Sequence, residues 1–244
     1  MINAILPASA CCAEAFADEA GHTPFPEEMA KVANAVDKRR REFATGRRCA
    51  RDALRSLGIE PAPILAGERG MPQWPPGVVG SITHCAGYRA AAVARGRDLL
   101  AIGIDAEPDG PLPAGVLDVV SLPAERAWLQ ALAEARPAVH WDRVLFSAKE
   151  SVYKPWFPLA RRWLGFDEAE VTLGSDDAPV DGSVPGRVDG SGDGGAEGIA
   201  SGTVEARFLV PGPVIGGQPL AGVSGRWMAR DGLVLTAITV PHSP

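Results

Sequence analysis

Three carboxylates and two lysines stand at spacings that could build a site for a divalent metal ion and a phosphate group. Asp105 and Glu107 lie two residues apart at the end of an apolar run, residues 99–104, that predicts a buried strand. Side chains at this spacing point the same way, and carboxylates that close repel each other unless a cation lies between them. Mg²⁺ prefers carboxylate oxygens completed by water and phosphate. The pair therefore predicts a metal-phosphate site, with a merely solvated strand end as the alternative.

A second set of charges lies in a predicted helix over residues 141–157. Lys149 precedes Tyr153 by four residues, and Glu150 precedes Lys154 by four, so each pair lies on neighbouring turns. A solvent-exposed face with one Glu–Lys pair would explain this spacing. However, the segment is rich in apolar and aromatic residues, and charges embedded in such a helix usually have a partner or a function.

A strongly basic segment precedes these motifs, with Lys38–Arg41 followed by Arg47, Arg48 and Arg51. In an ideal helix Arg40, Arg47 and Arg51 share one face, with Arg39 beside it. Arginine forks suit phosphate oxygens, so a terminal phosphate monoester is a natural ligand. A solvated face and a nucleic-acid patch are the alternatives, and the net charge of −6 disfavours the second.

The order of elements predicts an α+β fold. Helical periodicity at 27–57, with an interruption at Thr45–Gly46, precedes predicted strands at 78–82, 90–94 and 100–104. Helices then follow at 116–120, 124–135 and 141–157, and strands at 169–173, 204–210 and 233–240. We expect two similar α+β halves, residues 1–106 and 107–244, with the site between them. Residues 174–202, rich in Gly, Ser and Asp, predict a mobile insertion in the second half.

Composition narrows the class of protein. No apolar run reaches the length of a membrane span, and the N-terminus has no secretory signal, so we expect a cytoplasmic protein without a membrane partner. The four cysteines form no Cys-x-x-Cys pair and have no histidine at metal-ligand spacing. Neither zinc nor a disulfide framework is indicated.

The joint order of the motifs is more specific than any one of them. A basic helix, Gly80-Ser-Ile-Thr-His84, Gly103-Ile-Asp-Ala-Glu107 and Phe146-Ser-Ala-Lys-Glu-Ser-Val-Tyr-Lys154 follow one another. This order resembles the 4′-phosphopantetheinyl transferase superfamily, specifically its larger Sfp-like and EntD-like members, over about residues 36–166. The resemblance implies two pseudo-symmetric α+β halves and transfer of the phosphopantetheine arm of coenzyme A to a serine of an acyl or peptidyl carrier protein. Adenosine 3′,5′-bisphosphate would be released.

The resemblance also implies the roles of particular residues. The ligands of Mg²⁺, with Mn²⁺ as the alternative ion, would be Asp105, the carbonyl of Ala106, Glu107 and Glu150. The catalytic residues would be Glu150, as the base for the carrier serine, and Lys154, which stabilises the developing charge. The residues that contact coenzyme A would be Arg39, Arg47, Arg69, Thr83, His84, Asp105, Lys149 and Lys154. Ala66 stands where relatives often place a lysine, and Arg69 is the candidate replacement.

The partners implied are carrier proteins or carrier domains of polyketide, nonribosomal peptide or fatty-acid synthases, and the enzyme would act as a monomer without nucleic acid. Two other classes explain part of the pattern. A Mg²⁺-dependent hydrolase of nucleotide pyrophosphates would use the carboxylates, and a nucleic-acid-binding module would use the arginines. The first predicts nucleotide release without a carrier, and the second predicts strongly salt-dependent binding of DNA or RNA.

Overall fold

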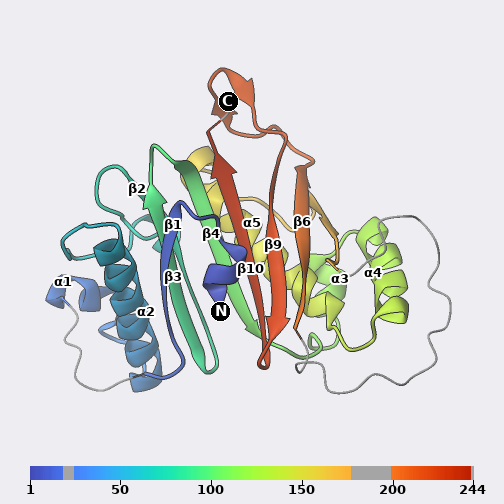
Figure 1. Ribbon diagram of the computed structural model, residues 1–244, viewed down its shortest axis with the longest axis horizontal. Helices are drawn as coiled ribbons and strands as arrows, with labels where there is room; N and C mark the ends of the chain where they lie inside the picture. The colour runs from blue at the N-terminus through green and yellow to red at the C-terminus, as the bar shows by residue number, and fades with distance from the viewer. Residues whose placement is uncertain (19–24, 177–198, 243–244) are drawn as a thin grey trace.

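The computed structural model of the chain describes residues 1–18, 25–176 and 199–242, and contains two larger antiparallel sheets that stand next to each other (Figure 1). The three-stranded sheet has the order β1-β3-β2 and consists of β1 (Ala10–Ala15), β2 (Val78–Cys85) and β3 (Tyr88–Arg95). The five-stranded sheet has the order β4-β10-β9-β6-β5 and consists of β4 (Leu99–Pro108), β5 (Ala169–Leu173), β6 (Ala200–Phe208), β9 (Gly222–Arg230) and β10 (Leu233–Pro241). A small hairpin pairs β7 (Val214–Ile215) with β8 (Gln218–Pro219).

Each of these two sheets carries one long helix. The α-helices are α1 (Pro26–Met29), α2 (Asp37–Ser56), α3 (Val116–Val120), α4 (Pro123–Ala135) and α5 (Trp141–Ala160). Short 3-10 helices are η1 (Ile2–Ile5), η2 (Ala30–Val32) and η3 (Glu68–Gly70). Helix α2 packs on β1 and β3, whereas α5 packs on β4 and β10 (Figure 1). None of the helices in the described residues combines the length and the apolarity that crossing a bilayer requires.

The predicted α+β class with two halves is confirmed, and most of the predicted elements are present. The predicted interruption at Thr45–Gly46 is wrong, because α2 runs through it as one helix. A Cβ at Gly46 would lie 3.3 Å from Cγ2 of Ile82, so the glycine lets the helix approach β2 closely. The buried apolar face behind it, which includes Cys49, Ala50 and Leu54, outweighs the roughly 1 kcal/mol that glycine costs inside a helix.

The core between the two sheets follows from period-two alternation in their strands. In β3, Ala90, Ala92 and Ala94 face the five-stranded sheet, whereas Ala91 and Val93 face α2. Small side chains on both faces let a sheet and a helix approach the strand closely. The core stays continuous across the two halves, because Leu235 and Ala237 of β10 pack into the same cluster as the β3 alanines.

A close approach of α5 to β4 brings the predicted catalytic motifs together. A Cβ at Gly103 would lie 2.0 Å from the carbonyl oxygen of Ser151 and 2.3 Å from Cδ of Pro155, so only glycine fits there. Pro155 has no N–H to donate to the Ser151 carbonyl four residues earlier. The carbonyl instead lies against the Gly103 backbone, at the centre of the contact between strand and helix.

Two hydroxyl groups join the smaller sheet to the larger one. The N–H of Ile104 donates to Oγ of Ser81 at 3.1 Å, and the N–H of Ala106 donates to Oγ1 of Thr83 at 3.0 Å. These bonds give hydrogen-bond partners to two backbone N–H groups on the edge of β4 that does not pair with β10. The tip of β4 is therefore fixed from both sides.

The proposed boundary after residue 106 lies within β4, which pairs with β10 from Leu99 to Pro108. Whether residues 1–106 and 107–244 are separate folding units stays a prediction. Most of the predicted insertion 174–202 lies outside the described residues. Its last part, Ala200–Gly202, belongs to β6.

Candidate active site

Asp105 lies near the end of β4 and is held by three side chains. Its Oδ2 accepts a hydrogen bond from Oγ of Ser147 at 2.8 Å. Its Oδ1 accepts hydrogen bonds from Nζ of Lys154 at 2.8 Å and from Oγ1 of Thr83 at 3.3 Å. The carboxylate is 6% exposed, so these bonds from β2 and α5 determine its orientation.

Four polar residues of α5 form a single stripe that faces β4: Arg143, Ser147, Glu150 and Lys154. Their spacings of four, three and four residues keep them on one side of the helix. Ser147 and Lys154 bind Asp105, whereas Nη1 of Arg143 donates to Oε2 of Glu107 at 3.0 Å. One face of α5 therefore contacts both acids at the tip of β4.

Glu150 is the exception in this stripe, because no hydrogen bond or ion pair joins its carboxylate to another of the described residues. Burial and the negative charge of Asp105 raise the pKa of Glu150. Burial and Asp105 likewise raise the pKa of Glu107, and Glu150 adds to the effect while Arg143 opposes it. The three carboxylates therefore lie within electrostatic reach of one another, as the sequence motifs predicted.

Among the described residues, no three His, Cys, Asp or Glu side chains converge as a ready-made metal site. Oxygens of Asp105 and Glu107 are instead bound by cations, Lys154 and Arg143. The chemistry of the donor set nevertheless fits a hard divalent ion, since one buried and two half-buried carboxylates repel one another and the carboxylate of Glu150 has no bonded partner among the described residues. Holding the ion requires side-chain adjustment around these carboxylates.

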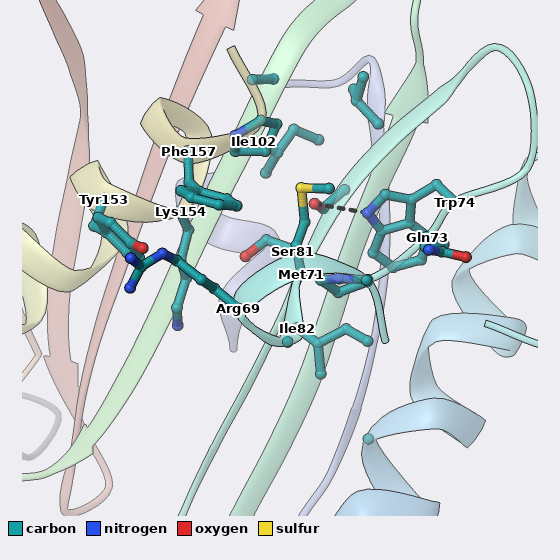
Figure 2. Close-up of a pocket in the computed structure, with 18 of the residues that line it drawn as sticks. Arg69, Met71, Gln73, Trp74, Ser81, Ile82, Ile102, Tyr153, Lys154 and Phe157 are labelled. Atoms are coloured by element: carbon teal, nitrogen blue, oxygen red, sulfur yellow. Dashed lines mark hydrogen bonds between the residues drawn. The ribbon is translucent and has the colours of Figure 1, made fainter. Parts of the chain in front are cut away.

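A cavity of about 670 Å³ lies between the two halves, within the size range of small-molecule sites. Its lining contains the predicted Arg39, Arg47, Arg69, His84, Glu150 and Lys154. Figure 2 shows Lys154, Tyr153 and Phe157 of α5 on one side of the cavity and Trp74 on the other, with Ser81 and Ile82 of β2 between them. The cavity thus joins a cationic end, an aromatic wall and the free carboxylate of the α5 stripe.

The cationic end holds a neutral histidine beside an arginine. Nη1 of Arg39 lies 2.6 Å from Nε2 of His84, and Glu42 lies 3.7 Å from the same guanidinium. Burial, followed by the charge of Arg39, lowers the pKa of His84. The imidazole is therefore neutral at pH 7, with Nε2 accepting from Arg39.

Arg47 is a buried cation with spare hydrogen-bonding capacity. It is 5% exposed, its guanidinium lies 4.5 Å from the centre of the Phe43 ring, and its Nε has no hydrogen-bond partner among the described residues. Burial lowers the pKa of Arg47 to about 10, which still leaves it charged at neutral pH. A buried, under-satisfied guanidinium in the lining of a cavity suits an anionic ligand.

Two residues that were predicted to contact coenzyme A are bonded to other parts of the protein and do not line the cavity. Nζ of Lys149 donates to Glu125 at 2.8 Å and to the carbonyls of Phe166 and Ala169 at 2.6 and 3.1 Å, so all three of its protons are used. The ammonium group of Lys149 is thus fully bonded within the protein, and its contact with phosphate stays a prediction. Thr83 is buried and its hydroxyl binds the Ala106 N–H and Asp105, so it supports the site from behind rather than lining the cavity.

Arg69 spans part of the cavity between the two halves. Its guanidinium lies 5.5 Å from the centre of the Trp163 ring, which in turn lies 4.8 Å from the Tyr153 ring. Figure 2 shows Arg69 extending toward Tyr153. Ala66 forms a backbone bridge with Pro72 at the base of the same loop. Arg69 therefore lines the cavity, and its replacement of the expected lysine stays a prediction.

Several residues of the site were not predicted from the sequence, namely Ser81, Trp74, Glu125, Arg143 and Arg161. Ser81 lies two residues before Thr83 and points the same way on β2, so the Ser-x-Thr pattern could have indicated the hydrogen bonds of both hydroxyls to β4. Arg143 lies four residues before Ser147 on the polar stripe of α5, which could have indicated it. Nothing in the sequence alone indicates that Glu125 forms an ion pair with Lys149.

The fold and the site define a class: a protein with two α+β halves and, between them, a cavity that is lined by cations suited to an anionic ligand and lies beside carboxylates. Two family models match the chain, the 4′-phosphopantetheinyl transferase N-terminal domain over residues 27–94 and the 4′-phosphopantetheinyl transferase superfamily over residues 101–180.

Known relatives extend the match to nearly the whole chain. The 4′-phosphopantetheinyl transferase Svp of Streptomyces mobaraensis is 54% identical over 98% of this chain and 89% of its own length. The transferase PptT of Mycobacterium tuberculosis is 46% identical over 98% of both chains. The transferase Npt of Nocardia iowensis is 49% identical over 98% of this chain and 99% of its own.

The chain belongs to the 4′-phosphopantetheinyl transferase superfamily. It is an enzyme that transfers the 4′-phosphopantetheine arm of coenzyme A to carrier proteins and releases adenosine 3′,5′-bisphosphate.

Proposed function

We propose that the transfer takes place at the contact between α5 and the tip of β4, with Glu150 as its central residue. The observation that carries this proposal is the free carboxylate of Glu150, which is half-buried near Asp105 on a helix face whose other polar members are bonded. Even a half-buried carboxylate is unfavourable without a bonded partner, which favours a functional reason for its position.

Coenzyme A would lie in the 670 Å³ cavity. Arg39, Arg47 and His84 would bind the phosphate on the ribose, supported by the under-satisfied guanidinium of Arg47. Lys154 would contact the diphosphate from α5, and Arg69 would contact the ligand from the η3 segment, with its guanidinium near Tyr153 and Trp163. Charge neutralisation and positioning are the main requirements of phosphoryl transfer, and this arrangement of cations supplies both.

Mg²⁺, or Mn²⁺ in its place, would be held by Asp105, Glu107, Glu150 and the carbonyl of Ala106. When bound, such an ion neutralises charge on the diphosphate oxygens. Lys154 and Arg143 would keep Asp105 and Glu107 in place through their hydrogen bonds, and Ser147 would hold Oδ2 of Asp105.

In the chemical step, the carrier serine oxygen would attack the phosphorus that bears the pantetheine arm. A new P–O bond forms while the bond to the adenosine 3′,5′-bisphosphate oxygen breaks. Glu150 would accept the serine proton, directly or through water, because burial and Asp105 raise its pKa toward neutrality and make it a better base. Lys154 would stabilise the charge that develops on the leaving bisphosphate.

The experiment is transfer to an apo carrier protein with coenzyme A and Mg²⁺, followed by mass spectrometry of the carrier. Glu150→Gln should abolish transfer while the protein stays folded, and EDTA should abolish transfer by the wild type. Glu134→Gln, at an exposed position of α4, is the matched control and should retain full activity. Full transfer by Glu150→Gln would refute the role of Glu150.

The partners proposed are carrier domains of polyketide, nonribosomal peptide or fatty-acid synthases, modified in the cytoplasm by a monomeric enzyme. One relative, enterobactin synthase component D of Salmonella typhi, is 35% identical over 58% of this chain, and its name connects it with a synthase. A panel of apo carriers from the three synthase classes tests the range, and light scattering tests the oligomeric state.

A further inference from the structure

Arg143 bonds the whole segment where β4 ends. Its Nη1 donates to Oε2 of Glu107 at 3.0 Å, its Nε to the carbonyl of Gly110 at 3.0 Å, and its Nη2 to the carbonyl of Pro111 at 2.8 Å. All three contacts fall within five consecutive residues of the chain. One guanidinium on α5 therefore fixes both the side chain of Glu107 and the backbone that follows it.

Glu107 needs such a partner more than its neighbour does. Asp105 has a short side chain that Ser147, Lys154 and Thr83 hold from both sides. Glu107 has a longer side chain, lies at a half-buried strand end and is repelled by Asp105 and Glu150. Without Arg143 it would turn away from the other two acids, because repulsion and rotamer freedom both favour that movement.

We propose that Arg143 is a positioning residue that holds Glu107 among the three acids so that it can serve as a metal ligand. Only Oε2 of Glu107 is bonded to Arg143, which leaves Oε1 available. The guanidinium group is essential to this role, because one planar group donates to three separate acceptors, the Glu107 carboxylate and the carbonyls of Gly110 and Pro111. The inference rests on the proposed metal-binding role of Glu107.

Whether metal affinity falls or rises when Arg143 is removed distinguishes a positioning role from a purely electrostatic one. If Arg143 acted only as a nearby positive charge, removing it would strengthen the binding of a divalent cation. If Arg143 positions Glu107, removing it weakens cation binding although the site becomes more negative. Loss of a residue that orients a metal ligand typically costs about 10- to 100-fold in metal affinity.

The experiment measures Mn²⁺ binding by electron paramagnetic resonance of free Mn²⁺, in the full-length enzyme saturated with coenzyme A. Arg143→Met should weaken Mn²⁺ binding by about 10- to 100-fold. Arg143→Lys keeps the charge but loses the fork, so it should also weaken binding and raise the Mg²⁺ concentration for half-maximal transfer. Thermal unfolding of each variant shows that the comparison is made on folded protein.

Asp142→Ala is the matched control, because Oδ2 of Asp142 accepts the N–H of Leu112 and so secures the same segment without touching Glu107. It should bind Mn²⁺ as the wild type does. Unchanged or tighter Mn²⁺ binding by Arg143→Met would overturn the inference, as would an equal loss in Asp142→Ala. If the wild type itself binds no Mn²⁺, the proposed metal site fails, and the inference fails with it.

Discussion

Replacement of Lys149 by methionine tests whether this lysine of the catalytic motif is structural. Its ammonium group and Glu125 form an ion pair in which the side chains are 2% and 0% exposed. Breaking a buried pair by removing one partner costs about 3–5 kcal/mol, because the other charge is left uncompensated. The N–H groups of Leu122 and Val171 still donate to Glu125 at 2.7 Å each, so we expect the lower end, about 3 kcal/mol.

A loss of that size is large for a single domain and shifts the folding equilibrium by about 100-fold. Urea unfolding, followed by circular dichroism, measures it, while transfer assays on the folded protein measure KM for coenzyme A. The double variant Lys149→Met/Glu125→Gln should recover part of the stability, because the uncompensated charge is gone. Lys154→Met is the contrasting control, with a smaller loss of stability and a larger loss of transfer.

The reasoning would be refuted if Lys149→Met unfolded within about 0.5 kcal/mol of the wild type and raised KM for coenzyme A at least tenfold. In that case the ammonium group would be binding phosphate rather than the 166–169 segment. Our account instead predicts that KM changes little once the folded fraction is taken into account.

Three further predictions concern packing, phosphate binding and pH. Gly103→Ala should destabilise the protein by about 1–3 kcal/mol or more and reduce transfer, because the added methyl group would meet the Ser151 carbonyl. Gly110→Ala is the control, because a methyl group there has open space. It should behave as the wild type in the same unfolding and transfer assays. Arg47→Met should raise KM for coenzyme A by about 10- to 100-fold, which corresponds to a lost charged hydrogen bond, and should leave KM for dephospho-coenzyme A nearly unchanged. Burial lowers the pKa of His84, so the unfolded chain binds the proton at a higher pH than the folded protein does. The stability that neutral His84 contributes should therefore be full above a pH of about 6.5 and fall as the pH decreases. The decline in melting temperature between pH 7 and 5 should be smaller in His84→Asn than in the wild type, and an equal decline would contradict this.

The sequence was sufficient to predict the elements with strong periodicity. The β5 prediction at 169–173 and the α3 prediction at 116–120 match the structure, because each is a short apolar pattern between turn residues. Strands β1 and β9 were missed. The first consists mostly of small residues, and the second includes two glycines and two arginines, so neither has a clear alternation of apolar and polar side chains.

The site could be predicted as a set of residues but not as a network. Asp105, Glu107 and Glu150 were correctly expected near one another, since motif order and strand geometry point to one place. The ion pair of Lys149 could not be inferred, because its partner Glu125 is 24 residues away on another helix whose packing depends on the whole core. Thr83 was expected to contact the ligand, yet it points the same way as Ser81, toward β4, whereas His84 on the opposite face of β2 lines the cavity.

The central claim is that Asp105, Glu107 and Glu150 hold one divalent ion beside coenzyme A in the cavity between the two halves. Crystals grown with Mn²⁺ and coenzyme A, measured at the manganese absorption edge, test it most directly. The account predicts one anomalous peak within bonding distance of oxygens of all three acids. Bound coenzyme A with the peak absent, or with Glu150 turned away from it, would contradict the account.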